Sequence, residues 1–307
     1  MNSYNKKEEQ EQMRQRLHPA TALLYLVAVV FLSLLFAHPF FLLALFVAVG
    51  TIILSCGLVH EWVNYLKVGC GFLLVIMMVN VLFVRAGSTV LFWGPAFPGL
   101  GRMRITLEAL CYGAGMGLRL LVIISAFCLL MYVVHPDGLI QLLGGRSYKT
   151  ALALGLSLRL FPLMRADFLR ITEVQQCRGV NYRGKKPGER IRKIVPAINV
   201  LLLSSLERAF QLAESLQVRG YGLGRRSHYL GKKWRLGDKL ITVCVGAGSL
   251  LSLWLVWSGQ AVYSYYPRLQ SIKIKEVYSA VCIGLLFIVP ACLNWGWKKW
   301  PSLRSRI

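Results

Sequence analysis

Long apolar runs alternate with strongly basic segments along this 307-residue chain. Hydrophobic residues make up 56% of the sequence, yet lysine and arginine outnumber the acidic residues 36 to 13, for a formal net charge of +23. A water-soluble core does not need so large an apolar fraction. A run of about 20 apolar residues is long enough to cross about 30 Å of hydrocarbon as a helix. We therefore expect an all-α, polytopic membrane protein whose basic segments lie outside the bilayer.

The apolar runs predict about six membrane spans. The first run, Pro19 to Leu58, is too long for one helix and contains Pro39. Proline disfavours helix at the residue before it, so we expect two spans joined by a tight turn. The glycine- and proline-rich segment 85–104 is expected to be irregular. The remaining spans are expected at about 68–84, 105–134, 240–257 and 277–293.

The distribution of lysine and arginine predicts the orientation. The polar region 137–239 contains 20 of them, and each terminal tail adds four. With six spans these three segments fall on one side of the membrane, and cytosolic loops carry the excess of positive charge. We expect both termini in the cytosol, with the basic surface near anionic membrane lipid. The expected regions are a tail (1–18), about four spans (19–136), a cytosolic helical region (137–239), about two spans (240–294) and a second tail (295–307).

Two long amphipathic helices are expected in the basic region. Apolar residues recur at helical spacing from Lys149 to Arg178 and again from Glu189 to Arg219. At about 1.5 Å per residue, each helix would reach about 45 Å. Pro162 and Pro196 predict a kink or a short break in each helix. Helices with so apolar a face must cover it against each other, against the membrane or against a partner.

Both predicted helices end in the same pattern, E-x-x-Q-x-R-G, and the two copies lie 41 residues apart. Glycine just past a helix end is an ordinary stop signal, and arginine in the last turn complements the helix dipole. One copy alone would therefore indicate only a helix end. Two matching copies favour two equivalent binding sites on a partner. At each site, an arginine at a rigid helix end would place its planar set of N–H donors in an acidic groove. The residues are Glu173, Gln176, Cys177, Arg178 and Gly179 in the first copy, and Glu214, Gln217, Val218, Arg219 and Gly220 in the second.

This arrangement resembles the T component of energy-coupling factor (ECF) transporters, the CbiQ/EcfT family. The similarity covers roughly Pro19 to Leu293 and includes the segments Arg104–Leu110 (R-I-T-L-E-A-L) and Leu158–Pro162 (L-R-L-F-P). The usual tripeptide of the family is Ala-Arg-Gly. Here Cys177 and Val218 stand in place of the alanine, and the Arg-Gly pair is intact in both copies.

The resemblance implies a transmembrane coupling subunit of an ATP-driven importer in the prokaryotic cell membrane. Two ABC-type ATPase subunits, or a homodimer, would hydrolyse ATP, and a separate membrane S component would bind the vitamin or metal ion. Arg178 and Arg219 would be the coupling arginines, each anchoring one helix end in one ATPase. The apolar helix faces would hold the S component and tilt it. The chain itself would be non-catalytic and without a cofactor, because ATP and magnesium would be bound by the partners.

Other classes of protein find less support in the sequence. Residues 179–186 approach the phosphate-binding P-loop pattern, but Lys186 stands where serine or threonine must hold magnesium. The positive charge would attract nucleic acid, yet no nucleic-acid module accompanies it, and the cysteines and histidines lack metal-ligand spacing. The alternative is a membrane enzyme acting on anionic lipid head groups. It would need acidic or nucleophilic residues gathered at the membrane interface, whereas here they are scattered (Glu61, Glu108, Asp137).

Arg119 lies inside the fourth predicted span. A charge at that depth costs about 3 kcal/mol on insertion scales and usually faces the interior of the helix bundle. A structural contact, to an acidic group or a carbonyl, and a functional role both stay open. On the same span, Gly113 and Gly117 lie four residues apart and predict a close approach of a neighbouring helix.

Overall fold

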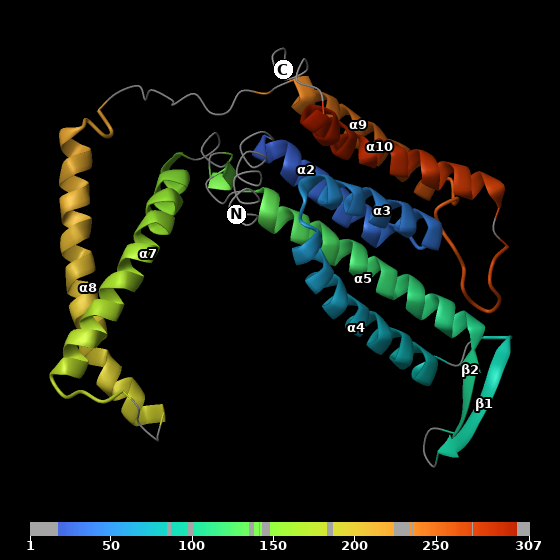
Figure 1. Cartoon of the computed structure of the whole chain (residues 1–307), viewed down its shortest axis with the longest axis horizontal. Helices are drawn as coiled ribbons and strands as arrows, with labels where there is room; N and C mark the ends of the chain where they lie inside the picture. Colours follow the sequence, from blue (N-terminus) through green and yellow to red (C-terminus); the bar gives the residue numbers. More distant parts are fainter. Residues whose placement is uncertain are drawn as a thin grey trace. The chain divides into compact units, whose positions relative to one another are not determined.

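The computed structural model describes residues 18–84, 87–97, 101–134, 138–140, 142, 148–182, 187–223, 234, 236–271 and 273–299. The described chain is almost entirely helical, and it divides into two compact units, residues 1–139 with 232–307 and residues 140–231 (Figure 1). Four parts of the sequence predictions lie outside the described residues: most of the N-terminal tail (1–17), Asp137, Lys186 and the end of the chain (300–307).

The first unit has a helix at each of the six predicted spans. Five of these helices are long and apolar enough to cross a membrane, while α2, with 17 residues, is shorter. The prediction of an all-α, polytopic membrane protein is thereby confirmed. The elements of this unit are α2 (Pro19–Leu35), α3 (Pro39–Cys56), α4 (Val59–Phe83), β1 (Val90–Phe97), β2 (Gly101–Thr106), α5 (Leu107–Val133), α9 (Leu236–Trp257) and α10 (Ile274–Lys299).

The segment between α4 and α5 differs from the prediction. Instead of being irregular, it forms the antiparallel strands β1 and β2, in which Val90 lies opposite Thr106 and Phe97 opposite Gly101. This segment contains aromatic and β-branched residues, which favour strands, as well as the glycines and prolines that predicted irregular structure. Pro95 falls at an irregularity of the register between Trp93 and Ala96, where a missing N–H is tolerated.

A small apolar core lies where α2, α3, α5, α9 and α10 meet. Side chains from all five helices are buried there, and tertiary packing of this kind supplies most of the stability of a helix. The helix α4 lies at the edge of the unit beside α5 (Figure 1) and reaches this core only through the partly buried Trp62. The most deeply buried core residues include Val29, Leu32, Leu45, Val49, Val122, Val245, Ile283 and Phe287.

Close approach to α5 holds α4 in place. A Cβ atom added to Gly117 would lie 2.4 Å from Leu73 Cγ, and one added to Gly113 would lie 2.9 Å from Met77 Cα. Larger residues would therefore force the two helices apart, and the close contact predicted for Gly113 and Gly117 is confirmed. Along α4, which the structure describes in full, Gly69 is the one buried residue.

Histidine side chains cap the first two helices of the unit. His18 and His38 each precede the proline that opens a helix, where a missing N–H costs nothing. Each ring accepts a hydrogen bond at Nδ1 from the backbone two residues on, from Ala20 N–H at 3.2 Å and from Phe40 N–H at 3.3 Å. The backbone N–H of His18 also donates to Asp238 Oδ1 of α9 at 3.1 Å, which ties the start of α2 to the start of α9.

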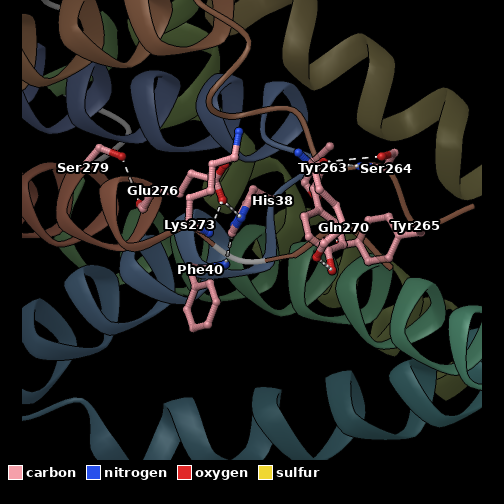
Figure 2. Close-up of polar contacts among 10 residues, drawn as sticks. His38, Phe40, Tyr263, Ser264, Tyr265, Gln270, Lys273, Glu276 and Ser279 are labelled. Atoms are coloured by element: carbon pink, nitrogen blue, oxygen red, sulfur yellow. Dashed lines mark hydrogen bonds and ion pairs between the residues drawn. The ribbon is translucent and has the colours of Figure 1, made fainter. Parts of the chain in front are cut away.

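The second cap ties the start of α3 to the start of α10. His38 is fully buried, and its Nε2 lies 3.3 Å from Glu276 Oε2, which also accepts the Lys273 N–H at 3.2 Å (Figure 2). Because Nδ1 accepts the Phe40 N–H, Nε2 carries the proton and donates to the carboxylate. The Tyr263 ring packs edge-on against His38, with 5.0 Å between centroids. Burial lowers the pKa of His38, although Glu276 opposes this shift, so the neutral, capping form is favoured.

The turn between α2 and α3 is also held by Arg119 of α5 and by Tyr265 from the segment between α9 and α10. Arg119 Nη2 donates to the carbonyl oxygen of Phe36 at 2.8 Å, and the Tyr265 hydroxyl donates to that of Ala37 at 2.9 Å. These two carbonyls come just after the last residue of α2, where the helix has no further N–H groups to donate to them. Of the alternatives for Arg119, the structure shows the carbonyl contact.

The second unit contains the two long amphipathic helices, α7 (Tyr148–Cys177, 30 residues) and α8 (Pro187–Val218, 32 residues), which pack on one another. Neither Pro162 nor Pro196 breaks its helix. Figure 1 shows α8 changing direction toward its N-terminal, yellow end. Proline inside a helix removes a hydrogen bond and favours such a bend.

Replacing His38 with alanine removes both the cap of α3 and the donor to Glu276. We expect the free energy of unfolding to fall by about 2–4 kcal/mol, because a lost N-cap costs about 1 kcal/mol and a buried acceptor without its donor costs about 1–3 kcal/mol. Asparagine at this position keeps a capping oxygen and should recover about 1 kcal/mol. Steric trapping in bicelles measures the change, with His60→Ala, at an exposed histidine, as the control. Equal losses in the two alanine variants would contradict the assignment.

Candidate functional site

The first arginine tip is a regular helix stop. Gly179 has a φ of +91°, and its N–H donates to the Gln176 carbonyl at 2.9 Å. The next N–H, of Val180, reaches back to the Gln175 carbonyl at 3.1 Å. These two bonds form a Schellman motif, in which a glycine in the left-handed conformation lets the chain satisfy the last carbonyls of the helix. Arg178 is the residue at the C-cap.

The second tip repeats this backbone bond for bond. Gly220 has a φ of +76°, and its N–H donates to the Gln217 carbonyl at 2.9 Å. The Tyr221 N–H reaches back to the Leu216 carbonyl at 3.0 Å, and Arg219 occupies the C-cap. The E-x-x-Q-x-R-G repeat of the sequence is therefore also a repeat of local structure, in which both arginines leave their helices from the same backbone position.

The side chains at both tips point to the surface. Val218 is 88% exposed, and Cys177, which takes the corresponding place on α7, is an exposed free thiol. Within the described residues, no hydrogen bond or ion pair engages the side chain of Arg178 or Arg219. The other predicted site residues (Glu173, Gln176, Gly179, Glu214 and Gln217) are exposed, and Gly220 is half-exposed. Both tips are thus free to contact another molecule.

Contacts that the sequence patterns did not indicate hold the first tip and the helix pair. The Tyr182 hydroxyl bonds to Gln175 Oε1, which folds the chain after the tip back onto α7. Asp167 and Arg208 bridge α7 and α8 at 2.7 Å. Gln175 occupies a variable position of the repeated pattern, and Tyr182, Asp167 and Arg208 lie outside it. Only a search for charged pairs at the repeat spacing could have found the second contact.

The faces of α7 and α8 are only partly covered. In the described part of this unit, the buried apolar residues are Ala151 and Ala197. Large apolar side chains remain exposed, among them Phe161 (68%), Leu203 (70%) and Phe210 (64%). So many exposed large apolar side chains along two helices indicate a surface that binds another molecule or the membrane. The sequence predicted that these faces are covered by each other, by the membrane or by a partner. Packing of the two helices on each other covers only a small part of them.

The acidic residues needed for lipid-head-group chemistry are not gathered together. The contacts of Gly113 with Met77 and of Gly117 with Leu73 show that α4 and α5 run antiparallel. Glu61 in the first turn of α4 and Glu108 in the first turn of α5 therefore lie at opposite ends of the pair, about 30 Å apart along the helices. The described residues also contain no group of histidine, cysteine and acidic side chains that could hold a metal ion.

Comparison with known proteins agrees with this architecture. The model of the family described as "CbiQ: Cobalt transport protein" matches residues 10–230. The chain is 28% identical over 257 residues to the energy-coupling factor transporter transmembrane protein EcfT of Lactococcus lactis subsp. cremoris, covering 79% of this chain and 92% of that protein.

Proteins of the same name in two other bacteria are similarly related. Identity is 29% over 194 residues with that of Listeria innocua (60% of this chain, 71% of the relative). It is 31% over 186 residues with that of Exiguobacterium sibiricum (57% and 68%). The family match covers well over half of the chain, including both Arg-Gly helix ends and four of the membrane helices. The chain therefore belongs to the CbiQ/EcfT family and is a multi-pass membrane T component of an energy-coupling factor transporter.

Proposed function

We propose that this T component couples two ABC-type ATPase subunits, or a homodimer, to a substrate-binding S component, so that ATP hydrolysis drives uptake of a vitamin or a metal ion. The observation that carries the proposal is the pair of matching tips. Each presents an exposed arginine from the same rigid backbone motif. Two equivalent projections suit two equivalent sockets on a pair of ATPases.

The chemistry of the tips fits this role. A guanidinium presents five N–H donors in a planar fork and stays charged at any physiological pH, so it can bind a carboxylate in a bidentate way. Such bonds are stronger than neutral ones, and they transmit force best when the arginine cannot swing freely. The Schellman motifs supply the backbone part of that constraint, because they fix the main chain on both sides of Arg178 and Arg219, from which the side chains project.

The uncovered apolar faces support the second half of the proposal. An S component is a membrane protein with apolar surface, and the exposed side chains of α7 and α8, such as Phe161 and Phe210, offer it a complementary platform. A change in the angle between the two helices would then tilt the S component. ATP and magnesium would be bound by the ATPases, which leaves this chain without a catalytic role or a cofactor. The separation of Glu61 from Glu108 gives the lipid-enzyme alternative no support.

Loss of both coupling arginines should break the link to the ATPases. We expect Arg178→Ala with Arg219→Ala to reduce the amount of ATPase co-purified with the tagged full-length chain by at least tenfold, since a hydrogen bond to a charged group contributes about 1.5–3 kcal/mol. Each single variant should lose one ATPase contact and keep part of the binding. Quantitative mass spectrometry of complexes purified from the producing cells measures this, with Arg170→Ala, an exposed arginine of α7, as the control. Unchanged assembly and undiminished uptake in the double variant would refute the proposal.

The proposal also places both tips and both termini in the cytosol. Cys177 is an exposed thiol beside Arg178, so a membrane-impermeant maleimide should label it in inside-out vesicles and leave it unlabelled in intact cells. Ser264, exposed between α9 and α10, should show the opposite pattern when changed to cysteine. Both measurements use a background in which the other cysteines are replaced by serine. Labelling of Cys177 in intact cells would overturn the orientation.

A further inference from the structure

The ion pair between α7 and α8 joins corresponding positions of the sequence repeat. Arg208 Nη2 donates to Asp167 Oδ2 at 2.7 Å, and the two residues are 41 positions apart. Arg178 and Arg219 are also 41 positions apart. In the repeat, the counterpart of Asp167 on α8 is therefore Arg208 itself.

Contact between counterparts has a geometric meaning. The helices α7 and α8 cross while running in opposite directions (Figure 1). Two helices related by a two-fold axis would bring a residue against its own counterpart only at that axis. The Asp167–Arg208 ion pair joins two such counterparts, so we take it as the point where α7 and α8 cross. Both arginine tips then lie 11 residues beyond it (178 − 167 and 219 − 208), which is about 16 Å along each helix.

The ion pair is one of few contacts that can set the crossing angle of α7 and α8. Its side chains are 30% and 20% exposed, so they are partly shielded from water. A guanidinium–carboxylate contact fixes direction as well as distance. The apolar side chains buried in the described part of this unit are two alanines, Ala151 and Ala197. A pair of helices without a large interlocking core has few other contacts that set its crossing angle.

We propose that Asp167 and Arg208 form the pivot pair of the two helices. They are positioning residues that fix the point about which α7 and α8 turn, so that displacement of one tip produces an equal and opposite displacement of the other. The inference rests on the proposed coupling function for its physiological meaning, but the pivot itself is a property of this chain alone. The pair need not touch ATP, substrate or the ATPases to act in this way.

The crossing angle can be measured directly in the full chain. Spin labels at Leu154 and Val195 report it, because these exposed counterparts each lie 13 residues before the ion pair and away from the tips. In nanodiscs and a background with the native cysteines replaced by serine, double electron–electron resonance should give one narrow distance distribution. We expect Asp167→Asn to broaden it at least twofold and the charge swap Asp167→Arg with Arg208→Asp to restore it. Glu207→Gln, at the exposed neighbour of Arg208, is the control. An unchanged distribution in Asp167→Asn would overturn the pivot.

The same labels in the assembled complex separate the two proposals. With co-purified ATPases, ATP and vanadate should shift the wild-type distance to a second narrow value, and Asp167→Asn should lose this shift while retaining the ATPases. A normal shift in that variant would also overturn the pivot. If instead the Arg178→Ala and Arg219→Ala variants keep their ATPases, the coupling function fails, and the distributions of the isolated chain still decide whether the ion pair sets the crossing.

Discussion

Backbone polar groups cannot be left unpaired in hydrocarbon, and this constraint determines most of the membrane unit. A helix pairs every internal N–H and carbonyl within one segment, so the apolar runs form helices. The backbone groups that still need partners are those at the helix ends. There the chain uses side chains as partners. His18 and His38 accept the first N–H groups of α2 and α3, and Arg119 covers a carbonyl after α2. Asp238 and Glu276 then connect these starts to α9 and α10, so the end caps also join α2 and α3 to the last two helices.

In the second unit, the same need to satisfy helix ends produces the two arginine tips. A Schellman motif pairs carbonyls in the last turn of α7 and of α8. The same motif fixes the backbone from which Arg178 and Arg219 project. The long helices leave large apolar side chains uncovered and pack through a small contact that includes the Asp167–Arg208 ion pair. Rigid helix ends, exposed apolar faces and a narrow crossing fit the proposed role, in which the two helices pass motion from the ATPases to a membrane partner.

The sequence predicted the helices well because their signals are local and repeated. Apolar runs and 3.6-residue periodicity located all eight long helices of the described chain, although the polar residues His60, Glu61 and Lys67 hid the first turns of α4. The β-hairpin was wrongly expected to be irregular, because glycine and proline outweighed the strand signal of Val90–Trp93. The backbone equivalence of the tips confirms the helix ends read from the repeat, while their binding role stays a prediction. Asp167 and Arg208 were missed because pairing across 41 residues depends on how two helices cross.

Contact between each tip and an ATPase is the central claim, and site-specific photo-crosslinking tests it most directly. Benzoylphenylalanine placed at Gln176 and, separately, at Gln217 lies one turn or less from each arginine. In living cells, irradiation of the full-length chain should give a covalent product with an ABC-type ATPase from both positions. Products from neither position, or from only one of them, would contradict two equivalent docking tips.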